Sequence, residues 1–306
     1  MTPVRRRANR RLVRWRGEYP DGRKPGLKED SPSKIMDCCD PIVDNDYFEP
    51  IHEDHWSELC NTAVHKSREQ RYRWTLDQNG RGSCGAECVH HGRHANETRQ
   101  DPGGFGVLTN PWGTYRITSG GRDNGSVIRE NVELIMRDGC HPEELHPRSL
   151  GWRAEPSAEA NRVAKLLTLK EFYYIERISD MISALLQGFE VIGGYAGHAI
   201  SFCQYMGRGL VKYKNSWGDW GAYGFGTLAT RDVYLGYGLF AFKSVSILDP
   251  DDWSPRYDQA DLARRVNRFM SDVNGVERAG SSRVWSRKSW LEDLYNQHLA
   301  GCELAL

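Results

Sequence analysis

The feature that most constrains the fold of this chain is a hairpin pattern centred on residue 208. The string Gly-His-Ala-Ile at 197–200 precedes a β-branched and aromatic run, a Gly-Arg-Gly turn at 207–209, and Lys-Asn-Ser-Trp-Gly at 214–218. Because such a turn folds two strands back antiparallel, His198 and Asn215 are predicted to lie at the same end of the hairpin. A side-chain amide there can accept from one imidazole nitrogen and leave the other to face a nucleophile. On its own, such a pair is more often structural than catalytic.

A candidate nucleophile lies upstream, at the start of a predicted helix. The glycine-rich turn at 79–83 is followed by Cys84, and a helix is predicted to begin near this residue. The partial positive charge at a helix N-terminus stabilises a thiolate, and a neighbouring imidazolium stabilises it further. The pattern therefore favours nucleophilic chemistry by a cysteine.

These strings resemble those of the papain-like cysteine peptidase family, in which Gly-His-Ala and Lys-Asn-Ser-Trp-Gly…Trp-Gly frame the base and its orienter. Here His198 and Asn215 stand 17 positions apart, close to the separation of the base and its orienter in the family. The block at 74–86 resembles the family's Gln…Gly-Ser-Cys…Ala block. The resemblance covers about residues 75–245. It indicates that the chain is similar to a divergent member of this peptidase family.

The resemblance implies a role for each site residue. His198 is the base, Asn215 its orienter, and Cys84 the nucleophile. Gln78, six residues before the cysteine, is the side-chain oxyanion donor, with the Cys84 backbone N–H as the second donor. The implied activity is hydrolysis of peptide bonds through a thioester, with a peptide or protein as substrate and no cofactor.

Cys88 is a rival nucleophile, one helical turn after Cys84. We favour Cys84 because it keeps the spacing to Gln78 and the preceding Gly-Ser. The sequence also departs from the best-known members, with Gly85 where they carry Trp, Asn79 where they carry Gly, and Arg81 where they carry a disulfide-forming cysteine. These departures weaken the subfamily assignment more than the site assignment.

The predicted fold class is α+β in the papain-like arrangement, with a helical half at about 70–170, an antiparallel β half at about 180–250, and the site in the cleft between them. Helices are expected around 56–70, from Cys84, and at 127–138, 158–167, 178–186, 255–275 and 285–300. Strands are expected at 191–192, 199–205, 210–213, 224–228 and 237–245. The stretch 103–126 is expected to be loop with short strands.

Three domains are predicted: a basic flexible arm and linker at 1–33, the papain-like domain at 34–250, and a helical C-terminal extension at 251–306. Seven arginines crowd the first sixteen residues, so this arm is a solvated tail, a transit-like segment, or a weak contact for nucleic acid or another acidic surface. Over the whole chain Lys plus Arg equals Asp plus Glu at 41 each, which gives no net attraction to nucleic acid. With no signal peptide or membrane-length apolar run in view, a cytoplasmic protein without membrane contact is expected.

Three alternatives to a peptidase stay open. Cys84, Cys88 and His91 share a helix face and carry ligand types that zinc prefers, although their spacing is not that of a common zinc motif. A catalytically silent papain-like domain used for binding is another, with the glycine-rich loop 103–126 blocking the cleft. The third is acyl transfer to an amine instead of water by the same thioester chemistry.

Overall fold

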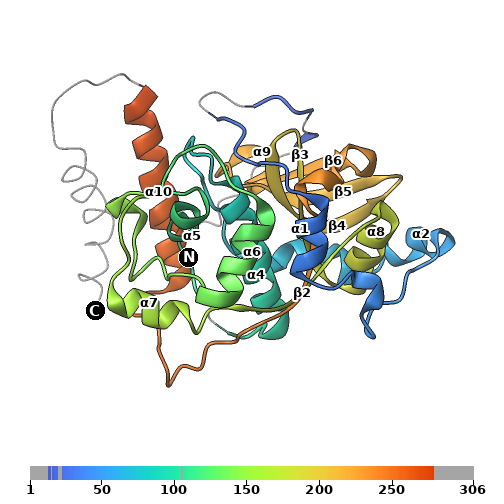
Figure 1. Ribbon diagram of the computed structural model, residues 1–306, viewed down its shortest axis with the longest axis horizontal. Helices are drawn as coiled ribbons and strands as arrows, with labels where there is room; N and C mark the ends of the chain where they lie inside the picture. Colours follow the sequence, from blue (N-terminus) through green and yellow to red (C-terminus); the bar gives the residue numbers. More distant parts are fainter. Residues whose placement is uncertain (1–12, 15, 20–22, 105, 279–306) are drawn as a thin grey trace, which may run out of the picture.

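A computed structural model describes residues 13–14, 16–19, 23–104 and 106–278, with only the backbone described at residue 13 and from residue 272 onward. It confirms the predicted α+β fold, with helices packed against a seven-stranded sheet of order β1-β6-β5-β4-β3-β7-β2 (Figure 1). The Arg-rich residues 1–12 and the helix expected at 285–300 lie outside the described residues, so both stay predictions. None of the helices in the described ranges is long and apolar enough to cross a membrane.

The sheet is built around the predicted hairpin. Its turn is made by residues 207–209, all with positive φ, and its register pairs Ser201 with Lys214. All named strand pairs are antiparallel except that of β1 with β6. The strands are β1 (Val13–Arg14), β2 (Leu169–Tyr174), β3 (Glu190–Tyr195), β4 (His198–Gly207), β5 (Leu210–Lys214), β6 (Phe225–Ala229) and β7 (Phe240–Val245).

Helix α4 (Cys84–Gln100) is the central helix and packs against β3, β4 and β7 as well as α5 and α6. Every residue from its first to Glu97 is buried, so it is enclosed on all sides. The close approach to the sheet requires glycine at 92, because a Cβ there would lie 2.9 Å from the ring of Phe242. The other helices are α1 (Pro32–Cys38), α2 (Trp56–Leu59), α3 (Ala63–Lys66), α5 (Pro111–Thr118), α6 (Ile128–Asp138), α7 (Ala158–Ala164), α8 (Ile178–Gln187), α9 (Trp220–Tyr223) and α10 (Gln259–Arg278).

Some predicted elements differ from the structure. The helix expected around 56–70 is broken into α2, α3 and a 3-10 turn at 68–71, because the Thr62 side chain caps a new start by accepting from His65 N. The stretch 103–126, expected to be loop, contains α5, whose Asn110 side chain accepts from Trp112 N and whose first residue is Pro111. Strand β2 was not predicted.

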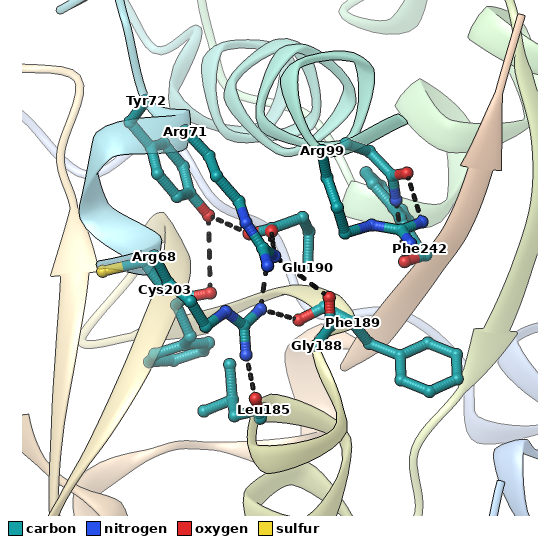
Figure 2. Close-up of polar contacts among 12 residues, drawn as sticks. Arg68, Arg71, Tyr72, Arg99, Leu185, Gly188, Phe189, Glu190, Cys203 and Phe242 are labelled. Atoms are coloured by element: carbon teal, nitrogen blue, oxygen red, sulfur yellow. Dashed lines mark hydrogen bonds and ion pairs between the residues drawn. The ribbon is translucent and has the colours of Figure 1, made fainter. Parts of the chain in front are cut away.

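A buried ionic cluster joins the segment that leads to the site with the sheet (Figure 2). The carboxylate of Glu190, at the start of β3, accepts from Arg71 at 2.7 Å, from the Tyr72 hydroxyl at 2.9 Å and from Arg68 at 3.4 Å. Arg68 also donates to the carbonyl oxygens of Leu185 and Phe189, at and just beyond the end of α8. These contacts fix residues 68–72, and the chain continues from there to Gln78.

Candidate active site

Cys84 is fully buried as the first residue of α4, at the positive end of the helix dipole. Burial raises the pKa of its thiol to about 12, and the backbone N–H groups of Ala199, Gly26 and Gly85 oppose that rise. The Ala199 contact places the sulfur beside the residue that follows His198. The thiol at the start of α4 thus lies beside the backbone at the start of β4.

His198 and Asn215 face each other across the base of the hairpin. The imidazole Nε2 lies 2.7 Å from the Asn215 Oδ1, which also accepts from the Ser216 N–H at 2.7 Å. Trp217 stacks on the imidazole with ring centroids 4.4 Å apart and an interplanar angle of 26°. Burial lowers the pKa of His198 to about 3, against the opposing effect of the Asn215 hydrogen bond. The pair is therefore fixed in orientation and shielded from water.

Gln78 is buried beside the same strand-to-loop segment. Its Oε1 accepts from the Ser216 hydroxyl at 2.9 Å and from Trp217 Nε1 at 3.2 Å, and its Nε2 donates to the Arg81 carbonyl at 2.5 Å. An amide NH₂ carries two donors, so the Arg81 contact uses only one of them. The structure thus orients the Gln78 side chain through the segment that also carries Asn215.

Cys88 packs in the interior one turn along α4, where burial raises the pKa of its thiol well above the usual value and its sulfur donates to the Gly85 carbonyl at 3.1 Å. The His91 Nε2 accepts from the Leu76 N–H at 3.2 Å. Over the ranges that the structure describes, no three His, Cys, Asp or Glu side chains are grouped so as to hold a metal ion. The alternative of a zinc site formed by Cys84, Cys88 and His91 is therefore wrong.

Solved structures of cysteine proteases superpose on this chain. The precursor of recombinant stem bromelain superposes with a TM-score of 0.50 at 13% identity, over 73% of this chain and 83% of that one. The chain has the papain-like fold. Xylellain, a cysteine protease from Xylella fastidiosa, gives a TM-score of 0.47 at 16% identity, over 81% of this chain and all of that one. No protein-family model and no curated protein matches the sequence.

In this papain-like fold the site is covered by the chain's own residues 23–30, which we call the strap. The N–H groups of Gly26 and Leu27 donate to the carbonyl oxygen of Gly197 at 3.1 and 2.9 Å. On the opposite wall, the Ser126 N–H donates to Gly26 O at 2.9 Å, and the Lys28 N–H donates to Ser126 O at 3.1 Å. The strap therefore bridges both walls of the cleft, although we expected it to be part of a flexible linker.

The strap reaches the sulfur because its residue at the narrowest point is glycine. A Cβ on Gly26 would lie 2.4 Å from the carbonyl oxygen of Gly82, two residues before Cys84. Tyr19 covers the other side, with its hydroxyl 2.7 Å from Ala196 O and its ring edge-on to His198 at 6.1 Å. These contacts account for the complete burial of both site residues.

Three ion pairs secure the strap. One of them joins Asp30 to Arg129 of α6 at 2.6 Å, and the other two are made by Arg23 and Lys24. Arg23 contacts the carboxylate of Asp77 at 2.5 and 3.2 Å, and Lys24 contacts that of Asp123 at 2.9 Å. None of these residues was predicted from the sequence to contribute to the site. Arg23 and Lys24 stand in a string rich in Gly and Pro that is typical of a linker, and no local pattern relates them to carboxylates 54 and 99 positions away.

While the strap is in place, the site holds a neutral thiol and a neutral imidazole. Burial moves the pKa of Cys84 up and that of His198 down, and both shifts disfavour the thiolate–imidazolium pair. We call this arrangement the closed form, because the strap shields both groups from water.

Proposed function

We propose that the protein is a cysteine peptidase that cleaves peptide bonds through Cys84, His198 and Asn215. One observation carries the proposal: the imidazole is held by Asn215 at 2.7 Å under Trp217, and the backbone of the next residue, Ala199, contacts the sulfur of the cysteine at the N-terminus of α4. A base with a fixed tautomer beside a thiol at a helix N-terminus is what thiol activation requires. The papain-like fold supports the same class of chemistry.

In the proposed reaction the thiol proton of Cys84 passes to His198, and the thiolate attacks the amide carbonyl carbon of a bound peptide. The second Nε2 hydrogen of Gln78 and the Cys84 backbone N–H, which is free of an intrahelical partner at a helix start, stabilise the oxyanion. The imidazolium then donates its proton to the leaving amine as the C–N bond breaks. His198 next takes a proton from water, and hydroxide releases the acyl group from the thioester.

The strap has to leave before a substrate enters, because it occupies the space over the sulfur. We therefore expect low activity from the chain as it stands. Higher activity is expected when Arg23→Gln and Lys24→Gln remove two of the three ion pairs that hold the strap. Both substitutions keep side-chain length and remove charge.

The test is cleavage of unfolded protein by this double variant, with products identified by mass spectrometry. Adding Cys84→Ala should abolish cleavage, and adding Cys88→Ala should leave most of it. If Cys88→Ala abolishes cleavage and Cys84→Ala does not, the nucleophile assignment is wrong. If the double variant cleaves nothing while its cysteine stays accessible to alkylation, the chain is a silent binding module.

A further inference from the structure

Two carboxylates on the cleft walls hold two adjacent basic side chains of the strap. Asp77 directly precedes Gln78, and Asp123 accepts from the N–H of Gly82, two residues before Cys84, at 2.8 Å. Arg23 and Lys24 are neighbours in the sequence and reach the two carboxylates from a single short segment. The strap thus holds two adjacent cations on carboxylates that lie close in sequence to Gln78 and to Gly82.

We infer that Asp77 and Asp123 are specificity-determining residues that select substrates carrying two adjacent basic side chains two and three residues away from the residue over the nucleophile. The inference rests on the proposed function and adds a substrate class to it. In this view the strap occupies the cleft as a mimic of the substrate, and its Arg-Lys pair uses the recognition sites of the substrate's own basic pair.

Asp77 is built to receive a cation. Its side chain is 11% exposed and that of Arg23 is 9% exposed, so the pair is largely shielded from water. Its Oδ1 also accepts from the Asn79 N–H at 2.9 Å, and the backbone at Gly218 approaches closely enough that a Cβ there would lie 2.7 Å from Oδ2. A carboxylate held this rigidly is unfavourable without a partner charge. When Arg23 leaves, a cationic side chain is the ligand that restores the lost interaction.

Asp123 is held ready in the same way. Its Oδ1 accepts from the Gly82 N–H and from the Tyr115 hydroxyl at 2.9 Å, which directs Oδ2 toward Lys24. Burial opposes ionisation, but the Gly82, Lys24 and Tyr115 contacts outweigh it and lower the pKa of Asp123, so the group stays a carboxylate at neutral pH. Arg81, at 3.5 Å, balances only part of its charge. A bound lysine or arginine completes the site.

The rival explanation is that both carboxylates serve only to secure the strap. The two explanations differ in what happens in the variant with Arg23→Gln and Lys24→Gln, which we call the unlatched chain. If the carboxylates also bind the basic side chains of substrates, their removal changes which peptides are cleaved. If they only secure the strap, their removal in an unlatched chain changes nothing about selectivity.

The test uses the full chain with Arg23→Gln and Lys24→Gln. Two synthetic peptides of equal length are compared, one with a central Arg-Lys pair and one with Gln-Gln. We expect kcat/KM to favour the basic peptide by at least about tenfold. Adding Asp77→Asn and Asp123→Asn should reduce that ratio to about twofold or less. The matched control Asp138→Asn removes an exposed carboxylate that pairs with Arg137 far from the strap contacts, and should leave the ratio unchanged.

A second arm separates this inference from the proposed function. In the same chain carrying Cys84→Ala, binding of the two fluorescently labelled peptides is measured by anisotropy, which needs no turnover. Tighter binding of the basic peptide that is lost with Asp77→Asn and Asp123→Asn supports the inference even if no variant cleaves anything. Equal cleavage of both peptides together with equal binding overturns the inference while leaving the peptidase in place. Failure of both peptides to bind overturns it as well.

Discussion

The backbone N–H of Leu27 donates to the carbonyl oxygen of Gly197 at 2.9 Å, one residue before His198. This carbonyl lies at the edge of the cleft, so any extended peptide that reaches the Cys84 sulfur has to compete with the strap for it. The same short segment also excludes water from the thiol and the imidazole. Closure of the site and the protonation state of its two reactive groups are therefore linked.

This link predicts that unlatching the strap speeds alkylation of Cys84. The thiolate is the reactive form, and burial holds the pKa of the thiol at about 12 in the closed form. Arg23→Gln with Lys24→Gln should raise the rate of iodoacetamide labelling at pH 7 by about tenfold or more, measured at the Cys84 peptide by mass spectrometry. Lys28→Gln is the matched control on the same segment, because that exposed side chain contacts only Asn124 in the described structure, at 3.2 Å. An equal rate in wild type and the unlatched variant would contradict the closed-site interpretation.

Gln78→Ala is predicted to lower kcat by roughly 10²–10³, because in the proposed mechanism it removes one of the two donors to the oxyanion. KM should change little, since the interaction strengthens mainly in the transition state. The control is Ser216→Ala, which removes one of two hydrogen bonds to the Gln78 Oε1 but keeps the donor. We expect a smaller loss there. Steady-state kinetics in the unlatched background measure both, and equal losses would make the role of Gln78 structural.

Glu87 provides a prediction about pH and stability. This fully buried carboxyl, one turn from the start of α4, has its pKa raised to about 8 by burial. The unfolded chain ionises near the ordinary value, so the folded state binds more protons between about pH 4 and pH 8, and its stability falls as pH rises through that window. Glu87→Gln keeps the shape without the ionisation.

Urea unfolding at pH 5 and pH 8 checks this expectation. The stability of Glu87→Gln relative to wild type should increase from pH 5 to pH 8, by on the order of 1 kcal/mol or more. A difference that stays constant across this range would mean that Glu87 ionises in the folded protein as it does in the unfolded chain.

Glu190→Gln is predicted to destabilise the fold by roughly 3–5 kcal/mol, because it leaves the buried Arg68 and the partly buried Arg71 without their carboxylate (Figure 2). The control is Glu155→Gln, because the Glu155 side chain is 76% exposed and pairs with Arg116. We expect this substitution to lower the free energy of unfolding by less than about 1 kcal/mol. Denaturant unfolding measures both. Similar losses in the two variants would show that the cluster around Glu190 is not the stabilising element we take it to be.

The hairpin was predictable because its information is local. A turn of three consecutive positive-φ residues at 207–209 lies between two strands of β-branched and aromatic residues, and this alone brings His198 close to Asn215. The start of α4 at Cys84 was predictable for the same reason. In both cases the neighbouring residues determine the backbone, so the pattern in the sequence was sufficient.

The strap could not be predicted, because its position depends on contacts between distant parts of the chain. Nothing in the string around Arg23 and Lys24 distinguishes a linker from a segment whose partners are Asp77 and Asp123. Helix α5 was missed for a related reason: Asn110 followed by Pro111 is typical of a turn, yet here it is the cap and first residue of a helix. Turn signals and helix starts use the same residues.

The strap is followed directly by α1, which packs on α6 (Figure 1). A ligand attached by so few residues experiences its site at an effective concentration on the order of millimolar, whatever the dilution of the protein. A free peptide with the same intrinsic affinity would need a comparable concentration to displace it. A single break in the backbone between Lys28 and Pro32 would replace that intramolecular equilibrium with ordinary non-covalent binding.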